Sequence, residues 1–360
     1  MSALRRLLAI VVKELSQLRR DRLTFAMIIG IPTIQLLLFG YAINMDLRNL
    51  DAAVVDQANT RRSRELIAAL VHTQVIDVVR TAPTPTEIDD WLRRGEISVA
   101  IVLPPDLERR LVRRDRPAVQ LIVDGSDPVT LQSARQLAAL PIYGDAGSPS
   151  MEVLNLYNPE RRSAINTVPG LIGVILTMTM VMFTGVAIVR ERERGNLEFL
   201  IATPVRPVEL IVGKVLPYVL IGLLQVTIVL TLGVAIFDVP IRGSLVDVYL
   251  AALTYIVACL GLGVFISTVA KTQFQAMQVA FFTFLPQILL SGFMFPYAGM
   301  PRAAQWIAEV LPLTHFIRMI RGIVLRAASL QELYPDLLAL VAFSAIALSI
   351  AVARFRKRLD

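Results

Sequence analysis

Long apolar runs recur along this chain, and they restrict its fold more than any other feature. A helix needs about 20 mostly apolar residues to cross roughly 30 Å of hydrocarbon. Runs near or beyond that length occupy residues 23–43, 168–189, 210–237, 245–270, 274–295 and 334–353. The first is too long for the apolar part of a signal peptide, and no small-residue cleavage site follows it. We therefore predict a polytopic α-helical membrane protein with six transmembrane helices, residues 23–43 forming the first.

Basic residues gather at the ends of these runs, which predicts the orientation. Six of them precede the first run and four follow the last. Because cytoplasmic flanks are enriched in Lys and Arg, both termini are expected in the cytoplasm, with residues 354–360 as a cytoplasmic tail. Leucines and valines spaced by three and four between residues 3 and 20 predict an amphipathic helix over 1–22 in the membrane interface. The alternative is a simple extension of the first span.

The segment between the first two runs, residues 44–167, is expected outside the membrane as an α/β domain. Short β-rich runs at 52–56, 75–80, 97–104 and 118–125 alternate with helical stretches. Asp56 and Asp124 each end a strand, where a ligand could be held, although strand ends and turns favour aspartate without any ligand. We assign this domain no chemistry.

Motifs for catalysis and for nucleotide binding are missing from the sequence. The only Gly-Lys pair, at Lys214, lacks the surrounding phosphate-loop pattern, and the chain has only two histidines, His72 and His315. Runs 23–43, 168–189 and 274–295 contain no acidic residue, which disfavours an ion-driven carrier. We expect no enzyme activity, no metal site and no bound cofactor, and any energy must come from another polypeptide.

A row of alternating charges, "RERER" at 190–194, stands between two apolar runs. Gly195 allows a break after it, and Thr203 with Pro204 can end the short apolar stretch that follows. We predict a short helix parallel to the membrane over 191–204, suited to being pushed by a soluble partner. A solvated loop that only marks the cytoplasmic side is the alternative.

Three segments resemble one family. "ERERGNLEFLIATPVRPVELIVGKVLPY" is similar to the cytoplasmic signature of type-2 ATP-binding-cassette (ABC-2) transport permeases, and "LSGFMFPYAGMPRAAQWIAEVLPLTHFIRMIRGIVLR" resembles the external segment after their fifth span. In that family the second segment forms re-entrant helices, here at about 296–326, which would give Arg318 and Arg321 a sheltered or aqueous surface. The insert, with Asp56, Ser63 and Arg64, resembles the periplasmic domain of a drug-efflux subgroup.

The resemblance implies a function and its residues. It implies a permease in the bacterial cytoplasmic (inner) membrane that exports a drug-like compound. Its membrane part would consist of the first span and residues 168–353. Separate ATPase subunits would bind ATP and Mg, a second permease copy or close paralogue would complete the channel, and a periplasmic membrane-fusion adaptor stays an open partner. The expected coupling residues are Glu191, Arg192, Glu193, Gly195, Glu198, Thr203 and Pro204.

The translocation path is expected between the second and fifth spans. The candidate residues are Thr177, Thr179, Thr184, Gln278, Thr283 and Gln287. Such residues in spans more often form hydrogen bonds between helices. Two rival functions remain: a receptor whose external domain senses a ligand, and an ion-driven carrier. The receptor would need an internal output domain, and residues 190–210 are short beside a domain of at least about 50 residues.

Overall fold

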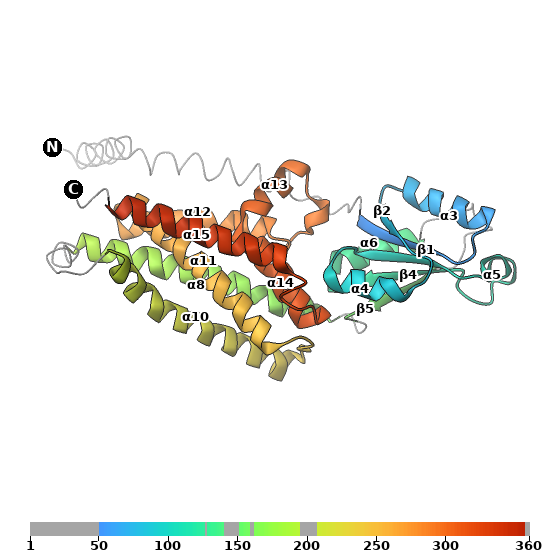
Figure 1. Ribbon diagram of the computed structural model, residues 1–360, viewed down its shortest axis with the longest axis horizontal. Coiled ribbons are helices and arrows are strands. Elements are labelled where there is room, and N and C mark those ends of the chain that lie inside the picture. Colours follow the sequence, from blue (N-terminus) through green and yellow to red (C-terminus); the bar gives the residue numbers. More distant parts are fainter. Residues whose placement is uncertain (1–49, 127, 140–150, 159–161, 195–206, 357–360) are drawn as a thin grey trace, which may run out of the picture.

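The computed structural model describes residues 50–126, 128–139, 151–158, 162–194 and 207–356. An α/β region lies at one end of a bundle of long helices (Figure 1). The predicted interfacial helix 1–22, the first predicted span 23–43, and Gly195, Glu198, Thr203 and Pro204 lie outside the described residues.

The α/β region contains a five-stranded sheet in the order β2-β1-β3-β4-β5. The strands are β1 (Leu50–Asp56), β2 (Ile76–Thr81), β3 (Val99–Leu103), β4 (Val119–Asp124) and β5 (Met151–Leu156). All neighbours are parallel except β3 and β4. Because β4 runs opposite to β1, Asp124 and Asp56 lie at opposite edges of the sheet. Asp124 therefore faces the helix bundle, while Asp56 accepts hydrogen bonds from the Asn59 backbone N–H at 2.9 Å and from the Ser63 hydroxyl at 2.5 Å.

Alternation along the strands divides the apolar side chains between the two faces of the sheet. On one face, Ala52 and Val54 belong to a buried cluster with residues of α3 (Arg61–His72), α5 (Leu107–Arg113) and α6 (Pro128–Ala139). On the other, Ala53 and Val55 pack with α4 (Thr86–Arg94). Strand β5 and its pairing with β4 are not among the strands predicted from the sequence. Its residues alternate between half-buried and exposed, and the one buried residue is the polar Asn155.

Five long helices form the bundle: α8 (Ser163–Glu193), α10 (Pro207–Phe237), α11 (Leu245–Val269), α12 (Gln273–Leu290) and α15 (Tyr334–Arg356). In the described part of the chain, four stretches are long and apolar enough to cross a membrane: Ala164–Glu193, Leu216–Phe237, Leu245–Val269 and Tyr334–Ala351. They correspond to four of the six predicted spans. Helix α12 covers most of the predicted span 274–295 but is not among the four, since glutamines interrupt its apolar sequence.

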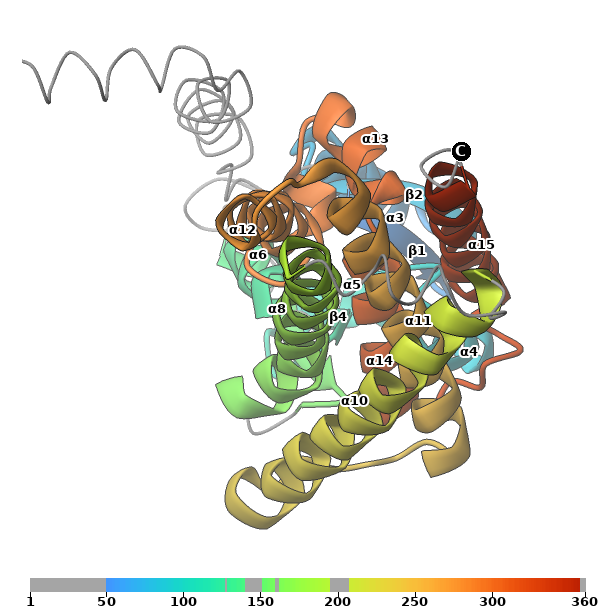
Figure 2. The same ribbon diagram turned by 90° about the vertical axis from the view of Figure 1, so that its left-hand side faces the viewer.

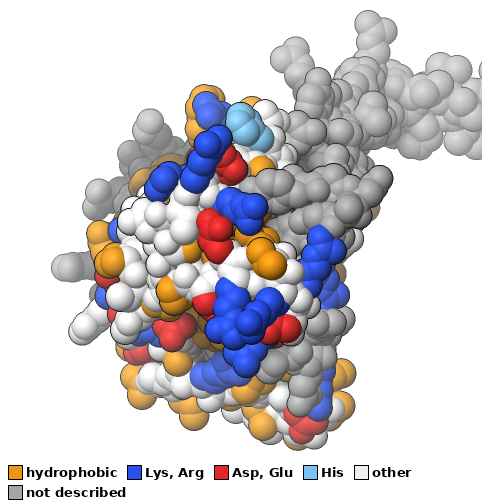
Figure 3. Space-filling model, turned by 90° about the vertical axis from the view of Figure 1, so that its right-hand side faces the viewer, with side chains coloured by type: hydrophobic (Ala, Val, Ile, Leu, Met, Phe, Trp, Pro, Cys, Tyr) orange, Lys and Arg blue, Asp and Glu red, His pale blue; other side chains and the backbone are white. Residues whose placement is uncertain are grey.

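The core of the bundle is α11, which lies between α8 and α15 (Figure 2). More than half of its residues are buried, whereas α10 leaves Leu216, Leu220, Leu224 and Ile228 exposed. That exposed apolar surface suits lipid. The face of the α/β region that points away from the bundle instead carries Arg among Asp and Glu (Figure 3), as a surface in water does.

Successive helices run up and down, so the bundle has two chemically different ends. The charged end holds Arg190, Glu193 and Lys271, and the domain end holds the start of α8 and the α10–α11 connection beside the α/β region (Figure 1). At the domain end the chain continues from α12 through η1 (Tyr297–Gly299), α13 (Arg302–Val310) and α14 (Pro312–Arg326). These short helices fall within the predicted range 296–326.

Helix α14 is buried along most of its length against α8, α11 and α15. The ring of Phe316 stacks on that of Tyr255 with centroids 4.3 Å apart. The two arginines expected to need shelter have acceptors nearby. The Arg318 guanidinium pairs with Glu309 at 2.5 Å, and Arg321 donates to the Gly292 carbonyl at 3.1 Å.

Candidate functional site

The charged row ends α8 and contacts the turn between α11 and α12. Arg190 and Glu193 are exposed, and Glu191 and Arg192 are half-buried. The row contains both signs of charge because the turn presents two helix ends of opposite polarity: the C-terminus of α11 and the N-terminus of α12.

Arg192 binds the C-terminus of α11. Its guanidinium donates to the Ser267 carbonyl at 3.1 Å and also to the Ala270 carbonyl. Carbonyls in the last turn of a helix lack partners within the helix, and a cation there is favoured by the helix dipole. The planar guanidinium can bond two such carbonyls at once.

Glu193 binds the N-terminus of α12. One carboxylate oxygen accepts from the Gln273 backbone N–H at 3.0 Å, and the other accepts from the Gln273 amide at 2.5 Å. Gln273 is the first residue of α12, where a negative charge is favoured. Arg190 donates to the amide oxygen of the same glutamine at 3.0 Å.

These contacts connect three helices at the charged end. A displacement of the last turn of α8 would be transmitted to α11 through Arg192 and to α12 through Glu193. Sequence reasoning selected Arg192 and Glu193 but missed Gln273. Its signal was Thr272 just before the fifth apolar run, because a threonine there marks a helix start and Gln273 follows it.

The α8 threonines point toward different neighbours. Thr177 is buried, donates to the Gly173 carbonyl at 2.7 Å and shares a hydrogen bond with the Tyr255 hydroxyl of α11. Thr179 donates to the Ile175 carbonyl at 2.7 Å and bonds Gln225 of α10 at 2.9 Å. These two side chains therefore join α8 to α10 and α11 in this conformation. Sequence reasoning missed Tyr255, although a hydroxyl within an apolar run usually has a partner.

The remaining candidates lie on α8 and α12. Thr184 of α8 is beside Gly263 of α11, and Gln278, Thr283 and Gln287 belong to α12. Thr283 bonds its own helix at the Val279 carbonyl, 2.8 Å away. Among the described residues no hydrogen-bond partner meets the Thr184 hydroxyl or the amide oxygens of Gln278 and Gln287. Gln287 is fully buried, so an oxygen without a partner there is costly. These oxygens are acceptors for a polar group that reaches them.

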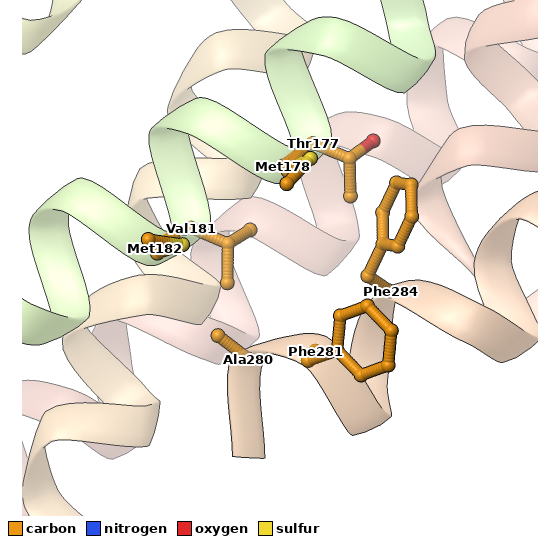
Figure 4. Close-up of a pocket in the computed structure, with 7 residues that line it drawn as sticks. All are labelled: Thr177, Met178, Val181, Met182, Ala280, Phe281 and Phe284. Atoms are coloured by element: carbon orange, nitrogen blue, oxygen red, sulfur yellow. The ribbon is translucent and has the colours of Figure 1, made fainter. Parts of the chain in front are cut away.

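A small apolar hollow separates α8 from α12 (Figure 4). Thr177, Met178, Val181 and Met182 line one side, and Ala280, Phe281 and Phe284 line the other. Its volume is about 20 Å³, room for about one water molecule, whereas drug-sized ligands occupy roughly 300 Å³ or more. In this conformation the contact is closed to such a compound.

Groups of metal ligands are missing from the described residues: no cluster of three or more His, Cys, Asp or Glu occurs there. Cys259 is buried in α11. The charged end offers helix-terminus contacts and hydrogen bonds, which suit the transmission of movement. We call the contacts of Arg192 and Glu193 with α11 and α12 the joint.

Comparison with known proteins shows which proteins the whole chain resembles. Among curated proteins, the chain is 30% identical over 363 residues to the probable multidrug ABC transporter permease YbhR of Escherichia coli K12, covering 98% of this chain and 99% of that protein. It is 28% identical over 370 residues to the probable multidrug ABC transporter permease YbhS of the same organism, covering 99% and 98%. It is 27% identical over 372 residues to the inner membrane transport permease YhhJ, with the same coverage.

The family match covers nearly the whole chain. Residues 22–353 match the family described as ABC-2 family transporter protein, a range that includes the charged row, the α8–α12 contact and the α/β region. The chain belongs to the ABC-2 family of membrane transporters.

Proposed function

We propose that this chain is the permease subunit of an ATP-binding-cassette exporter that moves a hydrophobic or amphipathic, drug-like compound out across the bacterial cytoplasmic membrane. The observation that carries the proposal is the joint at the charged end. There Arg192 and Glu193, at the start of the predicted coupling segment 191–204, bind the facing ends of α11 and α12. The names of the relatives, two of them multidrug permeases, support the substrate class.

The proposal includes six spans, with both termini and the charged end in the cytoplasm and the α/β region outside. The up-and-down course of the described helices supports it, because the charged row and Lys271 lie at one end and the α/β region at the other. The chain itself would bind no cofactor. ATP and Mg would be bound by separate ATPase subunits, and a second permease copy or a close paralogue would complete the channel. A periplasmic membrane-fusion adaptor would extend the path outward.

The proposed mechanism begins when the ATPase subunits close and press on residues 191–204. Since α8 is bound to both α11 and α12 at this end, pressure on its last turn displaces the ends of all three helices and changes how they pack farther along. The contact between α8 and α12 then opens from the packed arrangement, in which the hollow beside Thr177 admits about one water. Two alternative packings of the same helices would give access to each side in turn.

An affinity purification tests this function. The intact chain is purified from native membranes in mild detergent, co-purifying proteins are identified, and vanadate-sensitive ATP hydrolysis is measured. We expect a Walker-motif ATPase to be recovered, and expect replacement of Glu191 and Glu193 by Ala to abolish most of the hydrolysis while the chain stays folded. Arg194→Ala, an exposed change in the same row, is the matched control and should retain activity.

Recovery of the chain with no ATPase and no hydrolysis would refute the permease function. That result would favour a membrane receptor or an ion-driven carrier, since neither needs an ATPase partner. Equal hydrolysis in the double variant and in Arg194→Ala would remove the coupling role from the two glutamates and leave the family assignment intact.

A further inference from the structure

A polar pocket lies at the domain end of the bundle, far from the charged end. It is lined by Tyr157 and Asn158 after β5, Arg162 before α8, and Asp238 and Arg242 in the α10–α11 connection. These elements meet beside the α/β region in Figure 1. The volume of about 300 Å³ is at the small end of the range for ligand sites.

The pocket lies at a membrane boundary. Arg162 stands just before the apolar stretch that begins at Ala164, and Asp238 and Arg242 lie between the stretches that end at Phe237 and begin at Leu245. Ile236 and Phe237 beside it are 64% and 47% exposed. Residues between two spans lie at the level of lipid headgroups, whichever side of the membrane they face.

Hydrogen bonds hold the backbone of both arginines. Asn158 is only 3% exposed, and its amide accepts from the Arg162 N–H and donates to the Arg162 carbonyl, each at 3.0 Å. The Arg242 N–H donates to the Val324 carbonyl of α14 at 2.9 Å. The Arg242 guanidinium lies over the Tyr157 ring, 5.8 Å from its centre.

Two lining residues have the left-handed backbone that favours glycine. The φ angles are 68° at Tyr157 and 51° at Asp238. Aspartate tolerates this region, but a bulky aromatic residue rarely occupies it, and such strain persists mainly at sites where the surroundings impose it. Burial, with the charge of Asp124, raises the pKa of the Tyr157 phenol to about 12, so the ring beneath Arg242 stays neutral.

The described lining of the pocket carries one more positive than negative charge. Arg162 pairs with Asp238 at 3.3 Å, but the two side chains are 47% and 78% exposed, which makes the pair weak. In the described part of the chain no acidic side chain forms an ion pair with Arg242. The two arginines and one aspartate of the described lining therefore give a formal charge of +1, which one phosphodiester anion would neutralise.

We propose that this pocket binds the phosphate of an anionic phospholipid, with Arg162 and Arg242 as donors and the acyl chains on the apolar surface of Ile236 and Phe237. Arginine bonds phosphate through parallel N–H donors and is more weakly hydrated than lysine, so it suits an interface. A zwitterionic lipid adds a cation to an already positive site and binds less well. The site is separate from the proposed transport path and coupling joint.

Lipid selectivity tests the proposal. The full chain is reconstituted in phosphatidylcholine bilayers, and the immobilised fraction of spin-labelled phosphatidylglycerol is compared with that of spin-labelled phosphatidylcholine. The wild type should prefer phosphatidylglycerol, and Arg242→Gln should lower the affinity at this site about fivefold, the effect of one arginine near a charged surface. Arg242→Lys should retain part of the preference.

Arg113→Gln is the matched control, because it removes the same charge from an exposed position in α5. It should leave the preference unchanged. Equal selectivity in Arg242→Gln and Arg113→Gln, with both variants folded, would overturn the proposal. Displacement of the labelled lipid by millimolar inorganic phosphate would show a soluble anion as the ligand and overturn it too. The measurement needs no ATPase, so its failure is distinct from failure of the proposed function.

Discussion

At the scale of single residues, the partners of three side chains require one particular sign of charge. Arg192 meets carbonyls at the end of α11, and Glu193 meets an N–H at the start of α12. His315 shows the same logic at the domain end. Its Nδ1 lies 2.7 Å from the Asp336 carboxylate and its Nε2 lies 2.8 Å from the Glu309 carbonyl. Both partners are acceptors, so both ring nitrogens must donate and the imidazole is positively charged.

The charge of His315 predicts a pH dependence of stability. Burial lowers the pKa of His315, and Arg318 acts in the same direction. The hydrogen bonds and charge of Asp336 and the Glu309 carbonyl outweigh both and raise the pKa above 6.5. The protonated His315 therefore stabilises the folded protein. This contribution is fully present below the pKa of the unfolded state, near 6.5, and is lost as the pH rises through the higher pKa of the folded state. The unfolding temperature should therefore fall between pH 6 and pH 8.

Thermal unfolding in mild detergent at the two pH values checks this prediction. His315→Gln should remove much of the difference, while His72→Gln, at an exposed position in α3, should preserve it. A difference of the same size in His315→Gln and wild type would contradict a charged His315.

At the scale of elements, the close approach of α8 and α11 depends on missing side chains. A Cβ built on Gly263 would lie 2.9 Å from the Val181 carbonyl oxygen and 2.9 Å from the Thr184 Cβ. The backbone of α8 cannot move away from this added Cβ as the end of a flexible side chain could. Without a hydrophobic driving force between helices in lipid, such close packing supplies much of their association energy.

Gly263→Ala should destabilise the bundle, by about 1–3 kcal/mol for an overpacked contact. Gly261→Ala on the same helix is the control, since its Cβ would meet the side chains of Ala347 and Leu348 at 3.3 Å and 3.4 Å. Thermal unfolding monitored by size-exclusion chromatography compares the two. Because Ala has a higher helix propensity than Gly, propensity favours both variants equally. A Gly263→Ala variant as stable as Gly261→Ala would therefore show that the α8–α11 contact tolerates the added methyl group.

At the scale of the whole molecule, ion pairs attach the α/β region to the bundle. Asp124 at the end of β4 lies 3.2 Å from Arg326 of α14, and the two side chains are only 9% and 10% exposed. Arg93 of α4 pairs with Glu332 at 2.6 Å. Gly95, with a φ of 72°, ends α4 where a Cβ would meet the Arg326 guanidinium at 2.8 Å. The antiparallel direction of β4 brings Asp124 to this junction.

Asp124→Asn should cost several kcal/mol, on the order of 3–5, because it leaves the buried charge of Arg326 without its partner. We expect calorimetry to show the α/β region unfolding in a separate, earlier transition. Glu65→Gln, which breaks the exposed Arg61–Glu65 pair, should cost at most about 1 kcal/mol. Equal effects of the two substitutions would argue against a stabilising Asp124–Arg326 contact.

Local patterns sufficed to predict several parts of this protein. Apolar runs of spanning length predicted four of the apolar helices, since the bilayer sets their length. The sequence also predicted strands β1 to β4 and the helices between them. Buried strands need short runs of apolar, β-branched residues, and such runs can be recognised locally. Motif resemblance identified the family and drew attention to the charged row.

Tertiary structure decided the partners, because a contact between residues 80 or 200 positions apart leaves no local pattern. The sequence shows an alternating row at 190–194, but only packing shows that Arg192 meets the end of α11 and Glu193 the start of α12. In the sequence, Asp56 and Asp124 both end a strand. Because β4 is antiparallel to β3, Asp124 lies at the bundle and pairs with Arg326, whereas Asp56 lies at the opposite end of the sheet. Composition and period determined which segments enter the membrane, and strand direction and helix packing determined which charges meet.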